Sequence, residues 1–96
     1  MGRDAVYKAF SDPTRREILR LLRNGEMTAG QLSERFAISG PSMSHHFSLL
    51  KQADLISARR DGQQIYYSLN TTVVQDLIVA LFDLLPSEAR TEKPTG

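Results

Sequence analysis

The sequence predicts a mainly helical α+β domain, a winged helix-turn-helix with five helices and a two-stranded antiparallel wing. Three observations support this class. Two helical stretches between residues 28 and 53 are joined by about three residues. A pair of strand-like runs around Asp61-Gly62 follows them directly. A last apolar helical stretch then ends near Pro86.

The length and composition fit one domain over residues 1–86, followed by a disordered tail over residues 87–96. Hydrophobic residues make up 41% of the 96 residues and charged residues 24%, which is in the globular range. No apolar run approaches the roughly 20 residues that cross a bilayer. The opening MGRDAVYKAF lacks the basic-then-apolar pattern of a signal peptide, so we expect a cytoplasmic protein.

The chain has no cysteine, which excludes disulfides, thiolate metal sites and cysteine nucleophiles. Its net charge of +1 is unevenly spread. Residues 1–64 hold ten Lys/Arg against seven Asp/Glu, and residues 65–96 hold two against four. The basic front half indicates a surface for nucleic acid, although many soluble domains show such asymmetry without any such role.

Two helices open the chain. The spacing of Val6 and Phe10 predicts a short amphipathic helix over residues 3–10. Ser11 or Asp12 then caps a second helix that stops at Gly25. Its buried stripe is Ile18, Leu21 and Leu22, and the four arginines left for solvent or phosphate are Arg15, Arg16, Arg20 and Arg23.

The central pair of helices begins at a capping box formed by Thr28 and Gln31, which predicts a helix over residues 29–36. A turn follows, and Ser39 or Gly40 opens the next helix, with Pro41 in its first turn. On a helical wheel Met43, Phe47 and Leu50 fall on a buried face, and Ser44, His45, Ser48 and Gln52 fall roughly opposite.

The two histidines of this helix separate on the wheel. His45 points outward, whereas His46 lies about 60° from the core direction, where a partly buried histidine bonded to a backbone group is the structural alternative to a DNA contact. A metal site would need ligands on one face, but adjacent helical residues diverge by about 100° and no third ligand lies nearby. We expect no metal and no cofactor.

The hairpin is predicted with Asp61-Gly62 as its two-residue loop. In that register Ala58 faces Ile65 and Ile56 faces Tyr67, so the apolar side chains share one face. The arginines at the tip fit either an ordinary solvated turn or a wing that lies along phosphates.

The last helix, over residues 73–85, is expected to start at a Thr72–Gln75 capping box. Its apolar residues span about half its circumference, more than the roughly 100° arc that one core needs. The surplus predicts a homodimer, unless the N-terminal helix covers it within the monomer. The predicted dimer interface comprises Val6, Tyr7, Phe10, Val74, Leu77, Ile78, Leu81, Phe82 and Leu85.

No Gly-rich phosphate loop, nucleophile elbow or metal-ligand spacing is present, so we expect no enzymatic activity. Three segments carry a resemblance instead: KAFSDPTRREILRLL, MTAGQLSERFAISGPSMSHHFSLLKQADLI and RRDGQQIYYSL. They resemble the ArsR-type winged-helix repressors over about residues 6–85. Within that family the chain looks most similar to the metal-independent Sdp-type autorepressors, through DPTRREIL, MTAG, SMSHH and IYYSLNTTVVQD.

The resemblance implies a bacterial homodimeric repressor on an imperfect palindrome, with the helix over residues 41–53 in the major groove and the wing alongside. The metal sensors' cysteine pair and their His/Asp/Glu cluster are absent here. Sdp-type members imply relief of repression by a protein partner at the membrane. The predicted DNA contacts are Thr28, Gly40, Pro41, Ser42, Ser44, His45, His46, Ser48, Lys51, Arg59, Arg60, Gln63 and Gln64. A second hypothesis is a protein-interaction module that uses the apolar last helix and has no specific DNA site.

Overall fold

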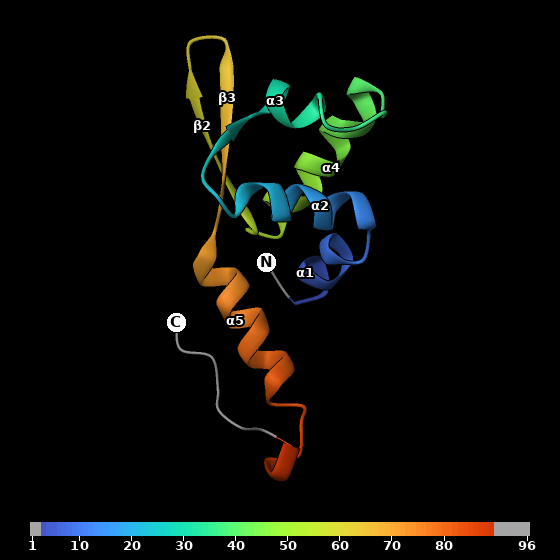
Figure 1. Cartoon of the computed structure of the whole chain (residues 1–96), viewed down its shortest axis with the longest axis vertical. Coiled ribbons are helices and arrows are strands. Elements are labelled where there is room, and N and C mark those ends of the chain that lie inside the picture. Colours follow the sequence, from blue (N-terminus) through green and yellow to red (C-terminus); the bar gives the residue numbers. More distant parts are fainter. Residues whose placement is uncertain (1–2, 90–96) are drawn as a thin grey trace.

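The computed structural model describes residues 3–89 and confirms the predicted fold class. The described chain forms five α-helices, one short 3₁₀ helix and a three-stranded antiparallel sheet (Figure 1). In chain order the elements are α1 (Arg3–Phe10), α2 (Pro13–Leu22), β1 (Met27–Thr28), α3 (Ala29–Ser33), α4 (Gly40–Gln52), β2 (Ile56–Asp61), β3 (Gln64–Leu69), α5 (Thr71–Phe82) and η1 (Ser87–Ala89).

Three helix starts follow local chemistry. Asp12 caps α2 by accepting a hydrogen bond from the Arg15 amide at 3.1 Å. Thr28 and Gln31 form the predicted capping box of α3, and Ser39 caps α4. The cap predicted for the last helix was wrong. That helix begins at Thr71 after Asn70, which makes no side-chain cap bond, so Thr72 already lies within the helix.

Several boundaries differ from the sequence-based expectation. Helix α3 ends at Ser33 rather than Phe36, and α5 ends at Phe82 rather than at Leu85. The first three residues of the segment predicted to be a disordered tail form η1. Residues 90–96 of that predicted tail lie outside the described residues.

The sheet differs from the prediction by one strand, because β1 pairs with β3 and gives the order β1-β3-β2. A two-residue strand carries no periodicity that sequence reasoning can detect. In this pairing Met27 lies opposite Tyr67 and Thr28 lies opposite Tyr66, so β1 connects the start of α3 to the base of the wing.

The predicted hairpin register was wrong. Asp61 pairs with Gln64 and Ala58 with Tyr67, so the loop is Gly62-Gln63. Gly62 has φ +65°, and a glycine with positive φ at the first loop position fits a type II′ turn. The register moves by two residues, so Ile56 and Tyr67 still lie on the apolar face, as predicted.

The core gathers residues from α1, α2, α3, α4 and the sheet. Ile18, Leu32, Leu50 and Leu55 are fully buried at its centre. Helix α5 has no buried residue. It runs from the base of the wing along the long axis of the molecule, away from the other helices (Figure 1), and Val73 and Val74 at its start pack against the core.

The hairpin turn gives a first prediction. Gly62→Ala should lower the free energy of unfolding by about 1 kcal/mol, because an alanine at positive φ is strained. The matched control is Gly40→Ala at the first position of α4, where an added Cβ meets open space and no positive φ is required. Urea unfolding of both variants checks this, and an equal effect at the two sites would contradict the turn assignment.

Candidate nucleic-acid interface

The outer face of α4 is the first part of the candidate interface. Gly40, Pro41, Ser42, Ser44, His45, Ser48 and Lys51 are all exposed, whereas Met43, Phe47 and Leu50 on the other face are buried. The predicted separation of the two faces is therefore confirmed. The exposed face presents hydroxyls, one imidazole and one ammonium, which can donate hydrogen bonds to base edges or phosphates.

The wing is the second part of the interface. Its tip lies toward the same end of the molecule as α3 and the N-terminal end of α4 (Figure 1). Arg60, Gln63 and Gln64 are exposed there. A cleft of about 520 Å³ lies between α3 and the wing, and it is lined by Thr28, Ala29, Gly30, Gln31, Glu34, Gln63, Gln64 and Ile65.

The two arginines of the wing differ in their surroundings, which the sequence did not reveal. The Arg59 Nη2 atom lies 2.6 Å from a carboxylate oxygen of Glu26, and its guanidinium carbon lies 4.4 Å from the ring centroid of Tyr66. The hydrogen bond to Glu26 is the main reason that the pKa of Arg59 is raised. Arg59 thus braces the wing against the loop before β1.

Thr28 lies at the N-terminus of α3, where a phosphate contact is predicted, but its side chain already takes part in the cap of this helix. Its side chain is buried, with 8% exposure, and its hydroxyl accepts a 3.0 Å hydrogen bond from the Gln31 amide. The hydroxyl is therefore occupied by the capping box that starts α3. The side chain that shares this cap, Gln31, is exposed and lines the cleft.

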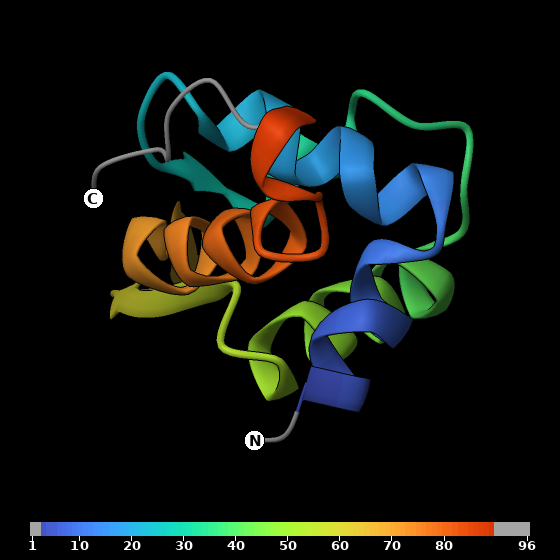
Figure 2. The same ribbon diagram turned by 90° about the horizontal axis from the view of Figure 1, so that it is seen from below.

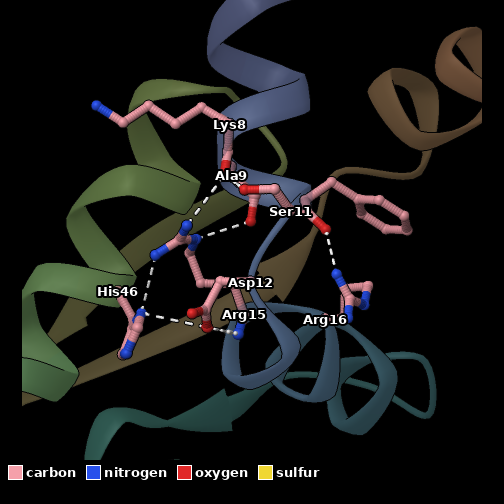
Figure 3. A network of polar contacts seen from close by, with 8 residues as sticks. Lys8, Ala9, Ser11, Asp12, Arg15, Arg16 and His46 are labelled. Atoms are coloured by element: carbon pink, nitrogen blue, oxygen red, sulfur yellow. Dashed lines mark hydrogen bonds and ion pairs between the residues drawn. The ribbon is translucent and has the colours of Figure 1, made fainter.

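His46 also lies away from the outer face. Its side chain is 15% exposed and faces α2, where its Nδ1 atom accepts a 3.1 Å hydrogen bond from Arg15 Nη1 (Figure 3). The same nitrogen lies 3.9 Å from a carboxylate oxygen of Asp12. His46 therefore fits the alternative to a DNA contact, a partly buried histidine, although its hydrogen-bond partner is an arginine side chain and not a backbone group.

Arg15 is the main residue that sequence reasoning missed. It was assigned to solvent or phosphate, but it is 8% exposed. Its Nε donates to the Ala9 carbonyl at 2.7 Å and its Nη2 to the Lys8 carbonyl at 3.0 Å. The signal was its spacing, because position 15 precedes the buried positions 18, 19 and 22 at helical intervals.

Asp12 completes this cluster. Although partial burial alone would raise the pKa of its carboxyl, the hydrogen bond from the Arg15 amide and the charge of the Arg15 guanidinium lower it below the ordinary value of 3.8. We name Asp12, Arg15 and His46 the α2–α4 joint, since their side chains connect the start of α2 with the middle of α4.

The residues of the predicted dimer interface divide into two sets. Tyr7 and Phe10 on α1, Ile78 and Leu81 on α5, and Leu85 just beyond it are more than 40% exposed. Val6 and Val74 are half-buried and pack against the monomer core. Leu77 and Phe82 are half-buried, and Leu84, which the prediction omitted, is 78% exposed.

The described residues include no group of three or more His, Cys, Asp or Glu side chains that could hold a metal ion. Over the same residues, no helix has both the length and the apolar character that crossing a membrane requires.

This geometry defines a class: a winged helix-turn-helix protein whose exposed helix α4 and hairpin wing share one end of the molecule. Known proteins agree with it. A family described as a helix-turn-helix domain matches residues 10–58. The transcriptional repressor SdpR of Bacillus subtilis is 66% identical over 73 residues, which cover 76% of this chain and 81% of that protein.

Other relatives point the same way. The arsenical resistance operon repressor of Staphylococcus aureus is 41% identical over 73 residues, covering 76% of this chain and 70% of that protein. NolR from Sinorhizobium fredii has a crystal structure that superposes with a TM-score of 0.69 at 34% identity, covering 85% of this chain and 82% of that one. The structure of an ArsR-like regulator from Rhodococcus sp. RHA1 superposes with a TM-score of 0.77 at 26% sequence identity. The match covers 84% of this chain and 74% of that one.

The chain therefore belongs to the ArsR family and is a DNA-binding transcriptional repressor of the winged helix-turn-helix class. These relatives are transcriptional regulators rather than enzymes.

The cap at Asp12 gives a second prediction. Asp12→Ala should lower the free energy of unfolding by about 1 kcal/mol, through loss of the N-cap of α2. Because the folded pKa of Asp12 is lowered, its ionisation stabilises the fold above the ordinary pKa and that contribution is lost as the pH falls through the folded value. The variant should therefore lose less stability than the wild type between pH 5 and pH 2, which urea unfolding over that range measures; equal losses would contradict the role of Asp12.

The wing arginines give a third prediction. Arg60→Ala should weaken DNA binding and reduce the slope of log affinity against log salt by about 1 for each bound subunit, because each subunit loses one phosphate contact. Arg59→Ala should reduce the slope by less, since Glu26 already balances its charge. Fluorescence anisotropy at several salt concentrations gives both slopes, and a larger change for Arg59→Ala would refute the distinction.

Proposed function

We propose that this protein is a homodimeric repressor that binds an imperfect palindrome in DNA upstream of its own gene and does not sense metals. The observation that carries the proposal is the arrangement of two surfaces. Helix α4 and the wing tip lie toward one end of the molecule, and α5 lies toward the other (Figure 1). The outer face of α4 is polar and exposed, and α5 carries the exposed apolar side chains Ile78 and Leu81.

The DNA-binding end supports recognition by two kinds of contact. Helix α4 offers Ser42, Ser44 and His45 on its exposed N-terminal half, which is the part of a recognition helix that meets base edges in the major groove. Lys51 and Arg60 supply positive charge for phosphates. Serines and one histidine read bases less decisively than a bidentate arginine, so DNA shape near the wing contributes to specificity.

The apolar end supports a dimer. Leu81 and Ile78 of α5 are 47% and 42% exposed, and Tyr7 of α1 is 44% exposed. Figure 2, which views the molecule from below, shows α1 crossing in front of α4 and α5 lying to one side of α1. Since Ile78 and Leu81 stay exposed, the N-terminal helix leaves this apolar surface of α5 uncovered, and a second copy of the chain is the simplest partner.

Two parts of the proposal concern regulation. The absence of cysteine removes the thiolate ligands of metal-sensing relatives, which favours regulation without metal. Relief of repression by a protein partner at the membrane is proposed from the similarity to the SdpR repressor and from the exposed apolar helix that a partner could bind.

DNA binding by the purified protein tests the proposal. Anisotropy titrations compare a labelled fragment from the region upstream of the gene with an unrelated fragment of equal length, at two salt concentrations. Saturable binding with strong preference for the upstream fragment, weakened by salt, is expected. Equal affinity for the two fragments would contradict autorepression. No binding to either would favour a protein-interaction module that uses α5.

The dimer gives a fourth prediction. Leu81→Glu should convert the protein to a monomer and weaken binding to the upstream fragment by about 10²-fold, since two linked half-site contacts become one. The matched control is Thr72→Glu, an exposed position about 180° away on the same helix. Sedimentation velocity gives the oligomeric state, and an undisturbed dimer of Leu81→Glu would show that this face of α5 is not the interface.

A further inference from the structure

We infer that Arg15 and His46 are positioning residues for DNA recognition, because their hydrogen bond fixes the orientation of helix α4 relative to α1. The inference rests on the proposed function. It adds that the angle at which α4 meets DNA is set by an internal polar link to the helix that is proposed to take part in the dimer.

Arg15 contacts both α1 and α4 (Figure 3). Two of its nitrogens donate to carbonyls near the C-terminal end of α1, at 2.7 Å to Ala9 and at 3.0 Å to Lys8. A third donates to His46 Nδ1 on α4 at 3.1 Å. The planar guanidinium holds these three acceptors in a fixed relative geometry.

The hydrogen bond between Arg15 and His46 is sheltered from water. Arg15 is 8% exposed and the His46 side chain is 15% exposed. A buried guanidinium needs all of its partners, because an unpaired donor in this setting is costly. The chain therefore keeps the link formed, and the link restrains α4.

His46 takes part in this hydrogen bond through its Nδ1 atom. A nitrogen that accepts a hydrogen bond carries no proton, so the proton of a neutral imidazole lies on Nε2. The side-chain oxygen of asparagine is attached at the same carbon as Nδ1 of histidine and can replace it as acceptor. Glutamine places its oxygen one bond further out, where Nε2 lies, and so loses the acceptor position.

The orientation of α4 affects base contacts more than phosphate contacts. Phosphate contacts tolerate small changes of angle, whereas hydrogen bonds to base edges do not. A loosened α4 should therefore lose affinity for its specific site and keep affinity for unrelated DNA. A residue that only stabilises the fold would reduce both in parallel.

The test compares His46→Gln with His46→Asn in the full chain, using the labelled upstream and unrelated fragments. His46→Gln should bind the upstream fragment about tenfold more weakly, which corresponds to about 1.4 kcal/mol, and the unrelated fragment within about twofold of wild type. His46→Asn should restore upstream binding to within about threefold. The matched control, Arg16→Lys, replaces the guanidinium that bonds the Phe10 carbonyl from the neighbouring position of α2, keeps the positive charge, leaves Arg15 and His46 in place, and should bind as the wild type.

Equal upstream affinity of the Gln and Asn variants would overturn the inference, and so would a parallel loss on both fragments. If wild type itself shows no preference for the upstream fragment, the proposed function fails and this inference fails with it. If His46→Gln does not fold, the double variant with Arg15→Met and His46→Asn replaces it. Equal affinity of the double variant and of His46→Asn alone for the upstream fragment would then overturn the inference.

Discussion

Burial of one stripe of α4 is the constraint on which the rest of this structure depends. Met43, Phe47 and Leu50 enter the core at 5% exposure or less. A fully buried side chain of this size contributes about 1.5–3 kcal/mol, so the helix cannot rotate about its axis without losing several such contributions. Fixing the buried face also fixes the outer face, which leaves Ser44, His45 and Ser48 in solvent.

Hydrogen bonds and ion pairs then restrain the positions of α4 and the wing, which apolar packing alone leaves adjustable. The core side chains determine which face of α4 is inward, and the α2–α4 joint adds directional bonds through Arg15 and His46. The wing is braced in a comparable way, since Glu26 holds Arg59 beside Tyr66 and β1 attaches the start of α3 to β3. The two parts of the candidate interface are thus supported by separate sets of contacts.

Features that depend on hydrophobic periodicity and helix capping could be predicted from the sequence. The fold class, the capping box of Thr28 and Gln31, and the two faces of α4 all follow from residue spacing. Long-range pairing was less accessible. The two-residue strand β1 exists because β3 offers it a partner, and the loop register depends on Gly62 taking the first turn position.

The candidate site shows the same division. Exposure of the outer-face residues of α4 and of the wing tip could be predicted from the helical wheel and the turn, whereas His46 is partly buried. The burial of Arg15, the bond from it to His46 and the pairing of Arg59 with Glu26 bring together residues that are 31 and 33 positions apart. Charged residues are usually assigned to solvent, and only the tertiary fold supplies the partners that allow them to be enclosed.

We propose that the two surfaces are separate in function, with DNA bound at α4 and the wing and self-association through α5. The most direct measurement is the change in ¹H–¹⁵N amide shifts when a short duplex from the bound region is added to labelled protein. We expect the largest changes in Gly40–Gln52 and around Gly62, with α5 little affected. Changes concentrated in Thr71–Phe82, with α4 and the wing undisturbed, would contradict this proposal.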